Sequence, residues 1–192
     1  MTRKRSAFIL ACIVLLTLLA AGCTRVSVNK EKENRIDCFS LTKNADNTYS
    51  YRLTDLEGRL LFEKENSVKE PRVELIAESV YEMKTQTGTG RSTNWAVYCD
   101  VENSKTSDIF YYVLEAKNDY VVYANYQDGE HSVIVQNIFD KAECYKVYKL
   151  NDVSPVAADF IVDCQENDDG SVTITYLAGD DYTEMEITIS LP

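Results

Sequence analysis

The sequence predicts an all-β, mainly antiparallel domain, folded as a sandwich or a strongly curved sheet. Apolar and polar residues alternate in several short segments, with the period of two that marks a half-buried strand. Turn-forming clusters such as Lys117-Asn118-Asp119 and Asp128-Gly129 separate these segments. Short strands spaced about 10–14 residues apart are typical of antiparallel sandwiches.

The first 22 residues have the composition of an export signal. Three basic residues, Arg3, Lys4 and Arg5, precede an uncharged apolar run over residues 7–20, and small residues follow it. A helix of about 14 residues rises only about 21 Å, which is short of the roughly 30 Å hydrocarbon core of a bilayer. A cleaved signal therefore explains this segment better than a permanent transmembrane helix does.

The end of this segment, Leu19-Ala20-Ala21-Gly22-Cys23, resembles the lipobox of bacterial lipoprotein signals, a short [Leu/Val]-[Ala/Ser]-[Gly/Ala]-Cys pattern. The resemblance covers residues 1–23 only, and Ala20 stands where leucine is commonest. It implies cleavage after Gly22 and a lipid on the thiol of Cys23. Several acyl chains on one cysteine hold a protein stably at a membrane. The expectation is an extracytoplasmic lipoprotein anchored to a bacterial membrane; a plain secretory signal with a chance cysteine is the alternative.

Residues 23–35 are predicted to be the lipidated cysteine and a flexible tether, because charges of both signs occur there without strand or helix periodicity. A single β-rich domain follows over residues 36–192. The net charge of the whole chain is −11, and removal of residues 1–22, with three basic and no acidic residues, lowers it to −14. Such an acidic surface repels nucleic acid, so a nucleic-acid partner is not expected.

Within the domain, three segments are apolar on both faces, as strands in the middle of a covered sheet would be. These segments are residues 109–114, 120–126 and 133–139. Clean alternation predicts half-buried strands at residues 94–101, 172–176 and 184–191. Residues 72–84 fit both a short helix and two strands that bend at Ser79, and the neighbouring strands favour the second interpretation.

No residue pattern points to a catalytic, metal or cofactor site. His131 is the only histidine, it follows a predicted turn, and no Gly-x-Ser-x-Gly motif accompanies it. The cysteines lack the spacing of a zinc site. The segment Asn167-Asp168-Asp169-Gly170 lacks the carboxylates that a calcium loop needs at its two ends, and we expect a hairpin turn there.

Tyrosine is the one residue type that favours a binding role, with 13 tyrosines against six phenylalanines. Seven of them concentrate in one stretch: Tyr111, Tyr112, Tyr120, Tyr123, Tyr126, Tyr145 and Tyr148. Tyrosine combines an apolar ring with a hydroxyl and serves binding faces as well as strand cores. We take Trp95 and Tyr98 as candidate ligand-facing residues, beside a polar loop at residues 87–93, although the strand phase of Trp95 also suits a core.

Four cysteines follow the anchor: Cys38, Cys99, Cys144 and Cys164. An even number in an exported chain allows disulfides, with three connectivities, but buried thiols are equally compatible with the sequence. Cys99 and Cys164 share the apolar phase of their strands and should point inward.

The sequence thus favours a non-catalytic domain that binds a glycan, a peptide or an envelope protein. The alternative is a carboxylate-dependent hydrolase or processing factor, since acidic residues are plentiful.

Overall fold

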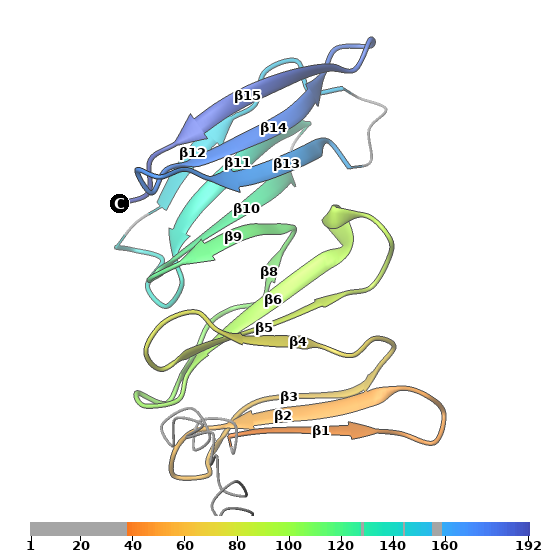
Figure 1. Cartoon of the computed structure of the whole chain (residues 1–192), viewed down its shortest axis with the longest axis vertical. Helices are drawn as coiled ribbons and strands as arrows, with labels where there is room; N and C mark the ends of the chain where they lie inside the picture. The colour runs from red at the N-terminus through yellow and green to blue at the C-terminus, as the bar shows by residue number, and fades with distance from the viewer. Residues whose placement is uncertain (1–37, 128, 144, 155–158) are drawn as a thin grey trace, which may run out of the picture. The chain divides into compact units, whose positions relative to one another are not determined.

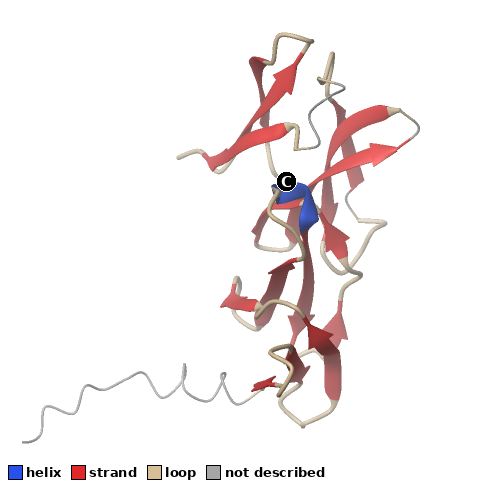
Figure 2. Ribbon diagram, turned by 90° about the vertical axis from the view of Figure 1, so that its right-hand side faces the viewer, coloured by secondary structure: helices blue, strands red, loops and turns tan. Residues whose placement is uncertain are grey.

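The computed structural model describes residues 38–127, 129–143, 145–154 and 159–192. Nearly all of the regular structure in these ranges is strand, which confirms the predicted all-β class (Figure 1). Within them, the one helical segment is the short 3-10 helix η1 (Arg91–Thr93), drawn in blue in Figure 2. The predicted signal, the lipid site Cys23 and the tether lie outside the described residues.

The described strands form four antiparallel sheets, and each sheet uses strands that are consecutive in the chain. Sheet A contains β1 (Phe39–Lys43), β2 (Tyr49–Thr54) and β3 (Leu60–Ser67). Sheet B contains β4 (Arg72–Leu75), β5 (Val80–Gln86), β6 (Asn94–Asp100), β7 (Lys105–Thr106) and β8 (Phe110–Tyr111). Sheet C contains β9 (Val113–Lys117), β10 (Tyr120–Gln127), β11 (Glu130–Asn137) and β12 (Tyr145–Lys149). Sheet D contains β13 (Ile161–Glu166), β14 (Val172–Ala178) and β15 (Thr183–Ile189).

Successive sheets pack face to face through three apolar layers. The first layer joins sheet A to sheet B, with Leu53 and Met83 at its centre. The second joins sheet B to sheet C around Tyr98 and Val121, and the third joins sheet C to sheet D around Val135. Strand β6 shows why one sequence can serve two layers: alternate side chains of a strand point to opposite faces, so its odd-numbered and even-numbered residues enter different layers.

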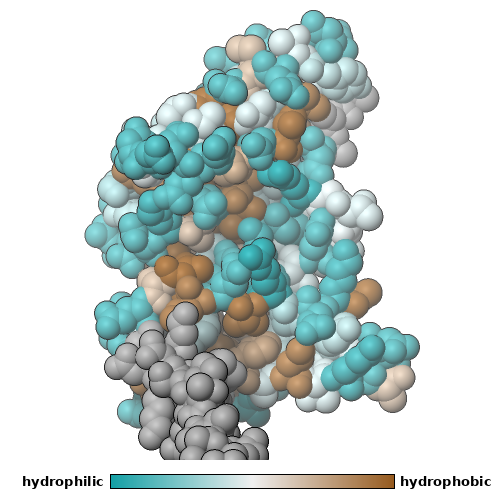
Figure 3. All heavy atoms as spheres, viewed as in Figure 1, coloured by the Kyte–Doolittle hydropathy of each residue, from teal (hydrophilic) through white to brown (hydrophobic). Residues whose placement is uncertain are grey.

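The two sheets at the ends of this series carry polar residues on their outer faces. In sheet D, Thr173 and Thr175 lie on the face opposite the buried Val172 and Ile174, and Thr173 pairs with Thr188 across the sheet. In sheet A, the corresponding outer residues Ser40, Arg52 and Glu63 pair in the same way. In the space-filling view, hydrophilic residues cover most of the visible surface and hydrophobic ones show in patches between them (Figure 3).

Several predictions of individual elements are confirmed. Residues 72–84 form two strands, β4 and β5, with the bend between them at residues 76–79. The hydroxyl of Ser79 stabilises this bend by donating a 2.8 Å hydrogen bond to Asp100. Strands β10 and β11 are the two inner strands of sheet C, as their two-sided apolar pattern indicates. The segment 167–170 is the turn between β13 and β14, where Gly170 has a φ of +80°.

The prediction of one central strand over residues 109–114 is wrong. This segment is a crossing between two sheets: β8 pairs with β6 in sheet B, and β9 belongs to sheet C. The break is at Tyr112, whose φ of +52° lies in the left-handed region and ends the extended conformation. Its buried residues are divided between two apolar layers: Phe110 and Val113 belong to the layer between sheets B and C, and Tyr112 belongs to the layer between sheets C and D. Ile109 and Tyr111 are exposed.

Candidate functional site: a basic pocket beside strands β4 and β5

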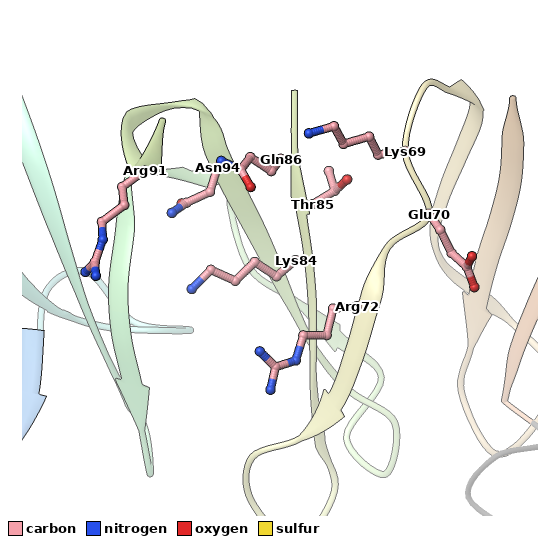
Figure 4. Close-up of a pocket in the computed structure, with 8 residues that line it drawn as sticks. All are labelled: Lys69, Glu70, Arg72, Lys84, Thr85, Gln86, Arg91 and Asn94. Atoms are coloured by element: carbon pink, nitrogen blue, oxygen red, sulfur yellow. The ribbon is translucent and has the colours of Figure 1, made fainter. Parts of the chain in front are cut away.

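A cavity of about 340 Å³ lies beside β4 and β5, and its lining is basic. Four cationic residues and one acidic residue contribute to it: Lys69, Arg72, Lys84, Arg91 and Glu70. The remaining lining residues are polar: Thr85, Gln86 and Asn94. We call this cavity the basic pocket; Figure 4 shows its residues.

The strand register brings two of the cations together. Arg72, the first residue of β4, pairs directly with Lys84 of β5, so both side chains lie on the same face of sheet B. Strand β5 continues for two residues beyond this pair, and Lys69 and Glu70 lie in the segment that leads into β4. In the close-up, the side chain of Lys84 extends toward Arg91, whereas the carboxylate of Glu70 lies away from both (Figure 4).

The four cations differ in how far their charges are already compensated. Arg72 forms an ion pair with Glu74 at 2.5 Å, and Arg91 has a looser one with Asp163 at 3.7 Å. Lys69 donates to the carbonyl oxygen of Gly88 at 2.9 Å. For the Lys84 ammonium group, no hydrogen bond or ion pair exists within the described part of the chain, although the residue is half-buried. A half-buried cation without a partner favours the approach of an anion.

The polar loop at residues 87–93 forms one wall of the pocket and is fixed in place by Asp159. The carboxylate of Asp159 accepts hydrogen bonds from the backbone N–H groups of Arg91, at 2.5 Å, and Ser92, at 2.7 Å. A side chain at Gly90 would overlap this carboxylate, which explains the glycine there. The backbone N–H groups of Arg91 and Ser92 are thus already occupied, and Arg91 is the residue of this loop that lines the pocket.

A second cavity, of about 350 Å³, adjoins the first, because Arg72 and Lys84 line both. It has an acidic part that consists of Glu74, Glu82 and Glu115. Glu82 is buried and accepts a 2.9 Å hydrogen bond from the hydroxyl of Tyr98. Burial, with the charge of Glu82, raises the pKa of Tyr98 far above its ordinary value, so this hydroxyl keeps its proton and acts as a donor.

The two candidate ligand-facing residues are core residues. Trp95 is 8% exposed and packs against Phe62 between sheets A and B, with ring centroids 6.1 Å apart. Tyr98 is 0% exposed, on the opposite face of β6. Neither reaches the surface, because sheet B is covered on both faces and β6 lies in its middle.

The other residues that the sequence singled out are structural. His131 is half-buried rather than exposed in a turn: its ring packs on Tyr126, at a centroid distance of 4.6 Å, and edge-on against Phe160, at 4.5 Å. The tyrosine-rich stretch is mixed, since Tyr112 is buried while Tyr111, Tyr126 and Tyr145 are exposed. In the described ranges, no group of histidine, cysteine and acidic residues could hold a metal ion.

Cys99 and Cys164 point inward, as expected, and both are free thiols. Burial raises the pKa of Cys99 to about 11 and that of Cys164 to about 12, so neither is a reactive thiolate at neutral pH. The thiol of Cys38 is also buried and donates to the carbonyl oxygen of Asp55 at 3.9 Å. Cys144 lies outside the described residues.

Sequence reasoning missed the four cations of the basic pocket. Two of them lie outside the strands: Lys69, which no local pattern marks, and Arg91, which belongs to the polar loop at residues 87–93. A usable signal does exist in the strand prediction: if residues 72–75 and 80–86 pair as a hairpin, Arg72 and Lys84 become neighbours. Two adjacent cations are notable in a chain with a net charge of −11.

No family model matches the chain, and neither a curated protein nor a solved structure matches it. Across the described residues, no helix is long and apolar enough to cross a membrane.

Proposed function

We propose that the chain is a lipid-anchored extracytoplasmic protein of a bacterial cell envelope, whose β domain binds a ligand without catalysing a reaction. The anchor is a lipid on Cys23, at the end of the lipobox-like segment 19–23. The ligand site is the basic pocket, and the ligand carries an anionic group, either a phosphate or a carboxylate. The observation that carries this proposal is the set of four cations around one cavity in a chain with a net charge of −11.

Electrostatics supports an anion there over a neutral or cationic ligand. With one acidic lining residue against four basic ones, the lining has a net charge of +3, opposite in sign to the protein as a whole. Glu74 and Asp163, outside the lining, pair with Arg72 and Arg91, so Lys69 and Lys84 are the lining cations that form no ion pair within the described ranges. The pocket is partly enclosed by protein, and interactions between charges are stronger there than on an open surface. The side-chain amide of Asn94 is already engaged, because it exchanges two hydrogen bonds with the backbone of Val113, at 2.7 and 3.0 Å. The anion would therefore be bound by the cations of the lining.

The experiment is calorimetric titration of the full-length chain in detergent, at low salt, with pyrophosphate as the probe. We expect saturable binding that Lys84→Gln weakens by about tenfold or more, because a hydrogen bond to a charged group contributes about 1.5–3 kcal/mol. Lys146→Gln is the matched control: it removes one positive charge from β12, outside the pocket. If the two variants weaken binding equally, or if pyrophosphate does not saturate, the pocket is not the ligand site.

The adjoining acidic cavity supports a second candidate, a carboxylate-dependent hydrolase. Glu74, Glu82 and Glu115 line one cavity, and hydrolysis of a glycosidic bond needs two carboxyl groups that flank the bond. Glu74 is in an ion pair with Arg72, and Glu82 is hydrogen-bonded to Tyr98. Glu115 accepts a 3.1 Å hydrogen bond from the backbone N–H of Ala116 and, within the described part of the chain, has no side-chain partner, so it is the carboxylate most available for chemistry. Loss of cell-wall hydrolysis in Glu115→Gln, with pyrophosphate binding retained, would favour this second function.

A further inference from the structure

A second groove lies on sheet C, away from the basic pocket, and it has a different chemistry. Two cavities, of about 360 and 260 Å³, lie side by side on one face of the sheet and share Asn125. Strands β10, β11 and β12 form the floor, and β8 of sheet B lines one side. We call it the tyrosine groove, after Tyr111, Tyr123 and Tyr145, which line it.

The strand registers place the polar and aromatic floor residues on a single face, and Ala124, which also lines the groove, belongs to the other face. Tyr123 pairs with Ile134, Asn125 pairs with Ser132, and Ile134 in turn pairs with Val147 of β12. The other face of the same strands carries the valines that pack against sheet D. Strands β7 and β8 of sheet B have two residues each, and the floor side chains of Tyr145 and Val147, on the edge strand β12, are exposed.

The floor offers neutral hydrogen-bonding groups that are not in use. For the side-chain amides of Asn125 and Gln127, no partner exists among the residues that the structure describes. Gln136 is 2% exposed; its Oε1 accepts a 3.1 Å hydrogen bond from Tyr123, and its Nε2 has no partner in the described part. A buried amide group that lacks a partner, as at Gln136, has a free-energy cost which a bound hydroxyl or carbonyl group would offset.

The charged residues of the groove neutralise one another. Asp108 forms an ion pair with Lys141, and Glu130 forms one with Lys149 at 2.7 Å. No charge along the groove is therefore left for an ionic ligand, in contrast to the basic pocket. Aromatic rings are exposed instead: Tyr111 is 63% exposed and Tyr145 is 56% exposed.

We propose that the tyrosine groove is a binding site for a neutral oligosaccharide. The open faces of Tyr111 and Tyr145 can pack on the apolar C–H faces of sugar rings. In the same groove, the amides of Asn125 and Gln127 and the hydroxyl of Ser132 each combine donors with acceptors, as sugar hydroxyl groups do. An elongated cavity with aromatic walls and a few polar groups that converge on it has the general form of a ligand site. This inference does not depend on the basic pocket or on the lipid anchor.

The test is calorimetric titration of the full-length chain with two neutral tetrasaccharides, cellotetraose and chitotetraose. We expect at least one of them to bind, and Tyr111→Ala and Asn125→Ala each to weaken binding by about tenfold, because interface energy concentrates in a few aromatic and polar anchors. Tyr182→Ala is the matched control, since it removes an exposed tyrosine from the turn between β14 and β15. It should leave the affinity unchanged.

Three results would overturn the proposal. The first is no binding of either tetrasaccharide at millimolar concentration. The second is binding that Tyr111→Ala and Asn125→Ala leave unaffected while both variants unfold at the wild-type temperature. The third is binding of a neutral extended peptide, tetra-alanine, that depends on Tyr111 while both sugars fail to bind, since the groove would then be a peptide site. Because pyrophosphate tests the other cavity, failure here leaves the proposed function standing, and the reverse also holds.

Discussion

Asp55 joins two sheets through one carboxylate group. Its Oδ1 accepts backbone N–H groups of Glu57 and Arg59 at 2.9 and 2.8 Å, which closes the turn between β2 and β3. Its Oδ2 accepts the hydroxyl of Ser104 and the Nε of Arg59, both at 2.6 Å. The hydrogen bond from Ser104, followed by those from Arg59, holds the pKa of Asp55 far below its ordinary value. Ser104 lies between β6 and β7, so this carboxylate connects sheet A to sheet B.

His131 should make the stability of the domain depend on pH. Burial between aromatic rings lowers its pKa below the ordinary 6.5, so the folded state favours the neutral imidazole. The stability this provides is fully present above about pH 6.5 and is lost as the pH falls through the folded pKa, because the unfolded chain binds the proton more readily. His131→Phe keeps an aromatic ring and removes the titration. Its unfolding temperature should therefore fall less than that of the wild type between pH 7.5 and 5.

The wild type and His131→Phe contain the same carboxylates, so the effect of carboxylate titration on stability cancels when the two proteins are compared. Thermal unfolding followed by circular dichroism at several pH values gives the two curves. Parallel curves across this range would show that the His131 proton is not coupled to folding.

At the scale of elements, the loop between β5 and β6 depends on a contact with a distant segment. Gly90 and Asp159 are far apart in sequence, yet the carboxylate of Asp159 lies where a side chain of residue 90 would be. Gly90→Ala should destabilise the domain by about 1–3 kcal/mol, as overpacking of a close contact does. The strain has a steric origin, because Gly90 has a φ of −87°, which any residue can adopt.

A double-mutant cycle separates this clash from an effect on the loop alone. Asp159→Ala by itself loses the two hydrogen bonds to η1 and should also cost stability. In the double variant the clash is absent, so the combined loss should be smaller than the sum of the two single losses. Urea denaturation measures all three free energies of unfolding. Strict additivity would mean that Gly90 and Asp159 do not interact.

Local patterns predict some elements well and others not at all. Strands β10 and β11 could be predicted because both faces are apolar and turn residues separate them. The crossing at Tyr112 could not, since a positive φ at a bulky residue is imposed by packing between two layers and leaves no mark in the sequence. The basic pocket falls between these cases: the Arg72–Lys84 pair follows from the hairpin register, while Arg91 needs the long-range contact with Asp159.

At the scale of the whole molecule, the arrangement of the sheets explains why the ligand-facing predictions failed. Strand β6 is covered by an apolar layer on each face of sheet B, so an aromatic residue on it is buried whichever way it points. Exposed aromatic residues occur where the covering sheet has short strands or where a strand lies at an edge, as at Tyr111 and Tyr145. Strand length and strand order are long-range properties, and neither follows from the period-two pattern of a single strand.

The last prediction separates the anchor from the domain. The three apolar layers consist of residues within 38–192, and Cys23 belongs to the lipobox-like segment that precedes them. Cys23→Ala should therefore abolish labelling by a fatty-acid analogue and prevent stable membrane attachment, because acyl chains on that thiol are the proposed attachment. The unfolding temperature of the domain should not change.

Cys164→Ala is the matched control: it removes a thiol from the domain and should keep the label. Label retained in Cys23→Ala would refute the lipid anchor, whereas a lower unfolding temperature would show that the N-terminal segment contributes to the fold.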